Sequence, residues 1–191
     1  MANEFYALLG RMRYITRWGL MRNTFSENIS EHSHQVAVLS HALALIRREI
    51  LQMEGPDPDR CAVAALYHDV SETLTGDMPT PIKYYNEDIK QAYKQVEKIA
   101  CNRLLDMMPE QLRKCYEPLI LEEDKAVTRL VKAADKLSAY IKCLEEQKAG
   151  NTEFESAANQ TWASMRGMKM AELDWFLDNC LDPYFLNLDQ L

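Results

Sequence analysis

Apolar residues recur at helical spacing along almost the whole chain of 191 residues. The clearest run alternates spacings of three and four: Val36, Leu39, Leu43, Ile46 and Ile50. Glycine (6) and proline (7) are scarce, so the chain offers few of the turns that a β-sandwich or barrel needs. No segment of useful length alternates with the period of two typical of strands. The pattern predicts an all-α protein, with one domain over residues 1–191.

The expected helices follow the apolar periodicity and the residues that begin and end helices. A short helix is expected over about 2–14, a long one from about Ser30, and an alanine-rich one from Pro58, capped by Asp57, to Glu72. The next long helix carries an inward stripe: Ile89, Tyr93, Val96, Ile99 and Leu104. Further helices are expected over about 109–120, from Val127 to a stop at Gly150, and within about 153–180.

Charge and cysteine usage restrict the class of partner. With 22 basic and 29 acidic side chains the net charge is −7, which argues against a binder of nucleic-acid polymers or anionic membranes. Five scattered cysteines, none in a C-x-x-C pair, argue against a disulfide framework. The first six residues contain no Lys or Arg, and apolar runs are too short to cross a bilayer. We expect a cytoplasmic protein.

Three of the four histidines fall within ten residues, but they cannot form one metal site. At about 100° per residue, His34 lies about 200° and His41 about 180° around the helix from His32. His32 is four residues before Val36 and therefore lies on the buried stripe. His34 and His41 are interpreted as surface or helix-packing residues.

The remaining candidates are acidic or histidine side chains beside apolar helix faces. His68-Asp69 closes the alanine-rich helix, and Asp135 sits in mid-helix, where a buried carboxylate needs either a Lys or Arg partner or a metal. With His32 they supply two imidazoles and two carboxylates, which suit Mn, Co, Fe, Ni or Zn. Glu72, three residues after Asp69, is either a base for an attacking water or a solvated helix-end residue.

Six segments around these residues carry a resemblance to a known family. They are Ile15–Trp18, Leu20–Asn23, Glu27–Ser33, Tyr67–Tyr84, Lys132–Leu137 and Tyr140–Glu146. The ligand pattern His32, His68-Asp69 and Asp135 resembles that of the HD-domain superfamily of metal-dependent phosphohydrolases. The segments as a set, from about residue 5 to the C-terminus, are similar to the bacterial HD-domain 5′-deoxynucleotidases.

The resemblance implies a helical bundle around a buried metal site, in a cytoplasmic homodimer. It implies hydrolysis of 2′-deoxyribonucleoside 5′-monophosphates to deoxynucleosides and phosphate by attack of a metal-bound water. The cofactor is expected to be one divalent transition metal, Co, Mn or similar. A metal and an arginine together can neutralise a phosphate monoester, so the net negative charge of the chain does not exclude this substrate.

The resemblance also implies roles for individual residues. Metal ligands are expected at four positions: His32, His68, Asp69 and Asp135. Substrate contacts are expected from nine: Arg17, Trp18, His32, Asp69, Asp77, Met78, Pro79, Thr80 and Asp135. Catalytic roles are expected for three: Arg17, which orients the phosphate, Asp69, and Glu72, which serves the attacking water. A surface salt bridge for Arg17 and core packing for Trp18 are the alternatives.

Two other functions remain open at this point. One is an HD phosphohydrolase for nucleoside triphosphates, cyclic dinucleotides or guanosine polyphosphates, although the short chain without extra basic segments disfavours large polyphosphates. The other is a non-catalytic HD module that binds a nucleotide or a partner, against which the complete ligand set and Glu72 count.

Overall fold

The computed structural model describes residues 3–83 and 85–191. The α-helices are α1 (Phe5–Leu9), α2 (Ile29–Leu45), α3 (Pro58–Leu66), α4 (Glu72–Thr75), α5 (Thr80–Lys83), α6 (Glu87–Leu105), α7 (Glu110–Ile120), α8 (Lys125–Lys148), α9 (Glu155–Gly167) and α10 (Ala171–Cys180). The described residues contain no strand, only an isolated antiparallel bridge between Thr16 and Asn28. The all-α class expected from the periodicity is confirmed.

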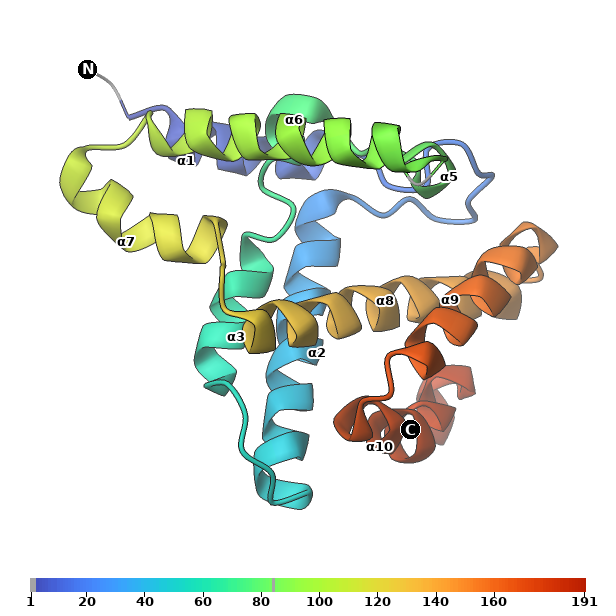
Figure 1. Cartoon of the computed structure of the whole chain (residues 1–191). Coiled ribbons are helices and arrows are strands. Elements are labelled where there is room, and N and C mark those ends of the chain that lie inside the picture. The colour runs from blue at the N-terminus through green and yellow to red at the C-terminus, as the bar shows by residue number, and fades with distance from the viewer. Residues whose placement is uncertain (1–2, 84) are drawn as a thin grey trace.

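Three helices form the centre of the molecule. α8 crosses α2 and α3 there, while α9 packs along α8 and α10 contacts α2 (Figure 1). The main apolar core is built on these helices and includes the buried side chains of Leu43, Ala65 and Leu137. Alanines on α3 and α8 let their backbones approach α2 closely, because small side chains leave little between the helices. This crossing brings residues far apart in sequence to one place.

A second layer covers one end of this centre. α6 runs across this end, away from α8, and its C-terminal part packs near α1 (Figure 1). A smaller apolar cluster of Phe5, Val70, Leu104 and Met108 packs beneath it. Among the described residues, no helix is both long and apolar enough to cross a membrane.

Local signals fixed several helix ends as expected. Asp57 caps α3, accepting a hydrogen bond from the Arg60 backbone N–H at 2.8 Å, and Pro58 occupies the first turn. α8 ends just before Gly150, whose φ of +85° lies in the left-handed region that favours glycine.

Two expectations about helix extent were wrong. α3 ends at Leu66, and His68 and Asp69 lie in consecutive turns before α4 begins at Glu72. The three residues therefore do not share a helical face. The expected N-terminal helix is divided into α1 and a 3-10 turn over Gly10–Tyr14.

The expected inward stripe of α6 was also partly wrong. Tyr93 and Leu104 are buried, but Val96 is 46% and Ile99 68% exposed. The periodic pattern marks these residues as one apolar face, yet no described helix covers its middle. The face extends beyond the part of α6 that packs on α1.

Candidate active site

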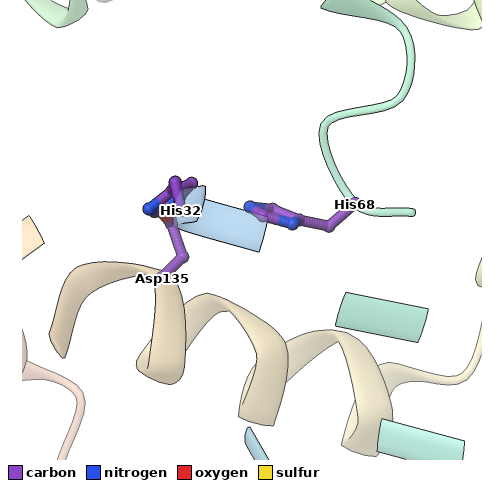
Figure 2. Close-up of side chains that lie close together, drawn as sticks. All are labelled: His32, His68 and Asp135. Carbon is purple, nitrogen blue, oxygen red and sulfur yellow. The ribbon is translucent and has the colours of Figure 1, made fainter. Parts of the chain in front are cut away.

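His32 lies fully buried one turn into α2. Asn28 and Glu31 cap this helix reciprocally, each side chain accepting a hydrogen bond from the other's backbone N–H at 3.1 Å. This capping box starts the helix at a defined residue and thereby fixes where the His32 side chain projects. The ring faces α8, where Asp135 projects toward it (Figure 2).

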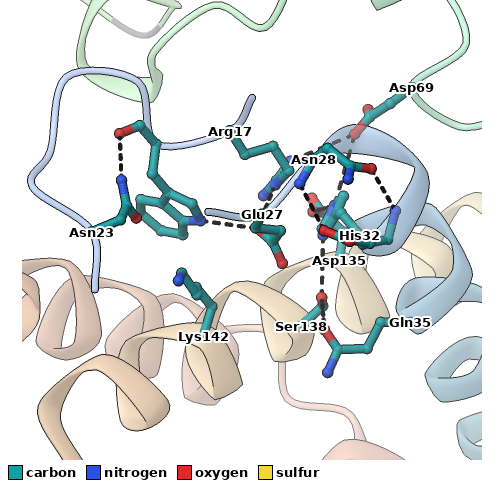
Figure 3. Close-up of polar contacts among 12 residues, drawn as sticks. Arg17, Asn23, Glu27, Asn28, His32, Gln35, Asp69, Asp135, Ser138 and Lys142 are labelled. Carbon is teal, nitrogen blue, oxygen red and sulfur yellow. Dashed lines mark hydrogen bonds and ion pairs between the residues drawn. The ribbon is translucent and has the colours of Figure 1, made fainter. Parts of the chain in front are cut away.

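A short series of hydrogen bonds sets the tautomer of His32. The Ser138 hydroxyl donates to Gln35 Oε1 at 2.8 Å, which leaves Ser138 Oγ to accept from His32 Nδ1 at 3.1 Å. A hydrogen on Nδ1 leaves a lone pair on Nε2. That nitrogen lies 3.1 Å from Asp135 Oδ1 and 3.7 Å from Asp69 Oδ2 (Figure 3). Nε2 therefore faces two carboxylates: in the protonated ring it donates to Asp135 Oδ1, and in the neutral ring its lone pair is available to a cation.

His68 presents its Nε2 to the same place. Its Nδ1 donates to the Ala65 carbonyl oxygen at 2.7 Å, since a carbonyl can only accept. Nε2 is buried, lies 3.1 Å from Asp69 Oδ2, and forms no hydrogen bond of acceptable geometry with any described residue. In the neutral ring this places a lone pair against a carboxylate oxygen. Such a contact is unfavourable unless a cation, either a proton or a metal, is present.

The carboxylates alter the pKa values of this cluster. Burial opposes the charged form of His68, but Asp69 and Asp135 outweigh it and raise its pKa to about 9. Burial likewise opposes ionisation of Asp69, yet His68, His32 and Arg17 hold its pKa far below the ordinary value. The hydrogen bond and charge of His32 overcome burial at Asp135 and lower its pKa to about 2. Both carboxylates are therefore ionised at neutral pH.

These residues fit a divalent metal. One ligand atom each from His32, His68 and Asp135 lies within 4.8 Å of the others, and Asp69 contacts both histidines. Two imidazole nitrogens and two carboxylates are the donors that Mn, Fe, Co, Ni and Zn accept. His68 Nε2, buried without a hydrogen-bond partner among the described residues, is the atom such an ion would satisfy. The structure brings all four expected ligands together from α2, the α3–α4 turns and α8.

Glu72 is buried at the start of α4, 6% exposed. Its Oε2 has no hydrogen-bond partner among the described residues. Burial, together with the charges of Asp69 and Asp77, raises the Glu72 pKa to about 9. A solvated helix-end glutamate would show neither burial nor this pKa, so that alternative is wrong.

Arg17 lies beside the cluster because its segment pairs with the residues just before α2. The Arg17 backbone N–H donates to the Glu27 carbonyl at 2.9 Å, and the side chain donates from Nε to Glu27 Oε2 at 3.0 Å (Figure 3). Its Nη1 is 3.7 Å from Asp69 Oδ2. Burial lowers the pKa of the guanidinium, but Asp135, Asp69 and Glu27 outweigh it and raise that pKa. The side chain is only 13% exposed, so the surface salt bridge considered for Arg17 is wrong.

Trp18 combines packing with a polar contact. Its ring lies 5.3 Å from that of Phe154, and its Nε1–H donates to Glu27 Oε2 at 3.0 Å. Trp18 has a φ of +59°, a left-handed conformation that bulky residues rarely adopt. Trp18 therefore packs in the core and also lies beside Arg17, so the core-packing alternative does not exclude a place in the candidate site.

The residues expected to hold a sugar lie on the loop between α4 and α5. Asp77, Met78 and Pro79 are half-buried, whereas Thr80 is exposed. Burial and the charge of Asp69 raise the Asp77 pKa against the opposing effect of Arg17, so this loop faces the same cluster. Tyr84, at the end of the segment that carried the resemblance, lies outside the described residues.

Sequence reasoning missed the residues that support the expected ligands. Glu27 accepts hydrogen bonds from Arg17 and Trp18, Ser138 contacts His32, and Gln35 accepts from Ser138. The only sequence signal was the polar run before α2, which contains Glu27. His34 is exposed and His41 lies 3.3 Å from Asp59, so neither joins the cluster, as expected.

Comparisons with known proteins agree with this geometry. A family model described as 5′-deoxynucleotidase YfbR-like matches residues 4–184. The 5′-deoxynucleotidase of Erwinia tasmaniensis is 47% identical over 192 residues, covering 99% of this chain and 96% of the relative. The 5′-deoxynucleotidase YfbR of Escherichia coli is 46% identical over 194 residues, with coverage of 99% and 96%.

Solved structures share the fold at lower identity. An HD-domain phosphohydrolase from Listeria innocua superimposes with a TM-score of 0.82 and 20% identity, covering 97% of this chain and 90% of that one. The cyanophage S-2L HD phosphohydrolase DatZ, described as bound to dA and one catalytic Zn²⁺, gives 0.68 and 20%, with coverage of 92% and 95%. The fold is that of the HD-domain phosphohydrolases. With a model match over almost its whole length and relatives above 45% identity, the chain belongs to the YfbR-like family of 5′-deoxynucleotidases.

Proposed function

We propose that this protein is a metal-dependent 5′-deoxynucleotidase that hydrolyses 2′-deoxyribonucleoside 5′-monophosphates to deoxynucleosides and phosphate. One observation carries the proposal: the Nε2 atoms of His32 and His68 meet the carboxylates of Asp69 and Asp135 beside a buried guanidinium. Donors for a metal and for a phosphate are thereby adjacent. The names of the relatives supply the class of substrate.

His32, His68, Asp69 and Asp135 would hold the metal. A divalent ion there would neutralise phosphate charge and lower the pKa of water toward neutrality. This chemistry does not depend on one particular element, because Mn, Co and Zn share it. The neighbouring DatZ structure, with its catalytic Zn²⁺, supports a divalent ion without selecting one for this chain.

Arg17 would bind and orient the phosphate. Its Nε is occupied by Glu27, so the donors left for a substrate are those of Nη1 and Nη2. A guanidinium can bind two oxygens of a phosphate with parallel hydrogen bonds. Next to Asp69, these donors would fix the phosphorus for attack from one side.

Glu72 would accept a proton from the attacking water. With a pKa of about 9 in the metal-free site, its carboxyl is protonated at neutral pH. Added positive charge beside Asp69 favours the ionised form, which is the form that can act as a base. Glu72→Ala is expected to retain metal binding and lose turnover.

Asp77 would accept a hydrogen bond from the sugar 3′-hydroxyl, with Met78, Pro79 and Thr80 as neighbouring contacts. The loop that carries them is stiffened by proline and ends at α5. Packing that leaves a 2′-hydroxyl without a partner would disfavour ribonucleotides by roughly 1–3 kcal/mol.

The remaining expectations are proposed with this function. Residues 1–191 would form a single HD-type domain, in a homodimer that works in the cytoplasm. The exposed apolar face at Val96 and Ile99 supports an interface between copies. The five cysteines are free, in keeping with a reducing compartment.

Phosphate release from a panel of deoxynucleoside mono-, di- and triphosphates tests the proposal. Release is expected from the monophosphates, with added divalent metal, and is expected to disappear after chelation and in Asp69→Asn. Turnover that survives chelation would contradict the mechanism. Preferential hydrolysis of triphosphates would favour another HD phosphohydrolase, and tight binding without turnover a non-catalytic module.

A further inference from the structure

We propose that Glu27 is a positioning residue that holds Arg17 and Trp18 together and aims the guanidinium at the substrate phosphate. The inference rests on the proposed function, in which Arg17 orients that phosphate. Arg17 Nε and Trp18 Nε1 both donate to the same atom, Glu27 Oε2, each at 3.0 Å. Figure 3 shows Glu27 directly beneath Arg17, on the side away from Asp69.

The backbone is built to bring two consecutive side chains to one carboxylate. The segment at Thr16 pairs antiparallel with Asn28, and the Arg17 N–H donates to the Glu27 carbonyl at 2.9 Å. In an extended segment, neighbouring side chains point to opposite faces. The left-handed φ of +59° at Trp18 breaks that alternation, so both side chains reach Glu27. A strained backbone at a bulky residue indicates a constraint imposed by its surroundings.

The strained turn has its own support. The Trp18 carbonyl accepts hydrogen bonds from the Met21 N–H at 2.9 Å and from Asn23 Nδ2 at 3.3 Å. The indole ring packs against Phe154. The two hydrogen bonds to its carbonyl and the ring contact with Phe154 therefore hold the indole N–H of Trp18 toward Glu27.

Glu27 decides which guanidinium donors remain for a ligand. Its side chain is 9% exposed, and such a buried carboxylate requires a charged partner. By occupying Arg17 Nε it turns the Nη edge toward Asp69, with Nη1 3.7 Å from Asp69 Oδ2. Without Glu27, the guanidinium would lose the hydrogen bond that fixes its rotation about the side chain. Its Nη donors would then no longer be held in the direction of the phosphate.

Three single variants separate positioning from general stability. Because both donors share one oxygen, the amide oxygen of Glu27→Gln can accept from Arg17 and Trp18, whereas Glu27→Ala removes both bonds. Glu27→Ala is expected to lower kcat on the order of 10- to 100-fold with a smaller change in KM. Glu27→Gln should recover most of that loss. Trp18→Phe, which keeps a ring but not the N–H, should fall between the two.

A double-mutant cycle tests whether Glu27 acts through Arg17. Lysine in Arg17→Lys lacks an Nε–H edge, so Glu27 has little left to orient. Adding Glu27→Ala to Arg17→Lys should therefore lower kcat by less than about 3-fold, a strongly non-additive result. Losses that simply multiply would show that Glu27 does not act through Arg17.

Two readouts do not depend on turnover. The indole ¹H–¹⁵N resonance of Trp18, identified by its loss in Trp18→Phe, should move in Glu27→Ala and stay near its wild-type position in Glu27→Gln. Metal affinity measured by calorimetry should be unchanged in both Glu27 variants, because Glu27 contacts Arg17 and Trp18, not the four expected ligands.

The outcomes separate this inference from the proposed function. A wild-type protein that releases phosphate from no deoxynucleotide overturns the proposed function, and the inference built on it. An active wild type together with an equally active Glu27→Ala overturns the inference alone. Equal loss in the Ala and Gln variants, or an unmoved indole resonance, also overturns it.

Discussion

At the residue scale, the position of one hydrogen atom on each histidine determines what the site can bind. His32 Nδ1 donates to Ser138, and His68 Nδ1 donates to the Ala65 carbonyl. Each contact leaves Nε2 as the nitrogen with the free electron pair. Groups outside the expected ligand set would thus prepare both histidines for a metal, which is the usual role of hydrogen bonds behind a metal site.

Removing one such hydrogen-bond partner should weaken metal binding. Ser138→Ala deletes the acceptor for His32 Nδ1 and is expected to lower metal affinity roughly 10- to 100-fold, measured by calorimetry on the chelator-treated protein. Ser40→Ala is the matched control. Ser40 lies on α2 and is buried like Ser138, but its hydroxyl has no hydrogen-bond partner among the described residues. Equal affinities in the two variants would contradict the role of Ser138.

Glu72 should make the metal-free protein less stable as the pH rises. Its pKa is about 9 in the fold and near 4.5 in the unfolded chain, so folding takes up a proton between these values. The free energy of unfolding then falls with rising pH, by up to about 1.4 kcal/mol per unit from this group. Glu72→Gln removes the effect. With chelator present, the free energy of unfolding of Glu72→Gln relative to wild type, measured by urea denaturation, should increase from pH 5 to pH 8. A difference that stays constant over this range would refute the buried, protonated carboxyl.

Residue types and spacing offered four candidate residues, the family resemblance implied that they are metal ligands, and the structure places them together. Sequence signals could not reveal the residues that orient them. Ser138 lies 106 positions from His32, and nothing in one sequence pairs a serine with a distant histidine. Glu27 is ten positions from Arg17, but their contact depends on the bridge at Thr16 and Asn28, which has no signature in the sequence.

At the element scale, periodicity predicted where helices lie and which face is apolar. Periodicity failed where tertiary contacts determine the path of the backbone. No glycine or proline lies between Leu66 and Glu72, so the local sequence permits a helix there. The chain instead turns after Leu66 and buries Val70 against Phe5 and Leu104. Those turns carry His68 and Asp69 to α2, a position that a continuous helix would not reach.

The cap of α2 should couple local helix stability to the site. Asn28→Ala is expected to lower the free energy of unfolding by about 1 kcal/mol and to weaken metal binding, because the first turn of α2 leads into His32. Asn86→Ala removes the equivalent cap of α6, away from the cluster. It should cost similar stability in urea denaturation and leave metal affinity unchanged. Unchanged metal affinity in Asn28→Ala would show that the cap of α2 does not influence the candidate metal site.

At the scale of the whole molecule, the exposed apolar face of α6 is the surface on which the proposed homodimer can be tested. If Val96 and Ile99 are covered by a second copy, Ile99→Asp should shift the mass from two chains to one, measured by light scattering with size-exclusion chromatography. Val38→Asp, at an exposed apolar residue of α2, is the control and should leave the mass unchanged. A wild-type monomer would contradict the proposed homodimer.

The net charge of −7 is compatible with an anionic substrate of small size. Binding a nucleic-acid polymer needs an extended basic surface, whereas one phosphate needs a metal and one arginine. Arg17 lies among four acidic groups, Asp135, Asp69, Glu27 and Asp77. A cation bound to this acidic cluster would shift the local balance toward accepting a phosphate.

Phosphate release from matched pairs of 2′-deoxyribonucleoside and ribonucleoside 5′-monophosphates, with divalent metal and after chelation, tests the central claim most directly. We expect hydrolysis of the deoxyribonucleotides that needs metal, with kcat/KM exceeding that for the ribonucleotides roughly 5- to 150-fold. Equal rates for both members of each pair, or release that persists after chelation, would contradict it.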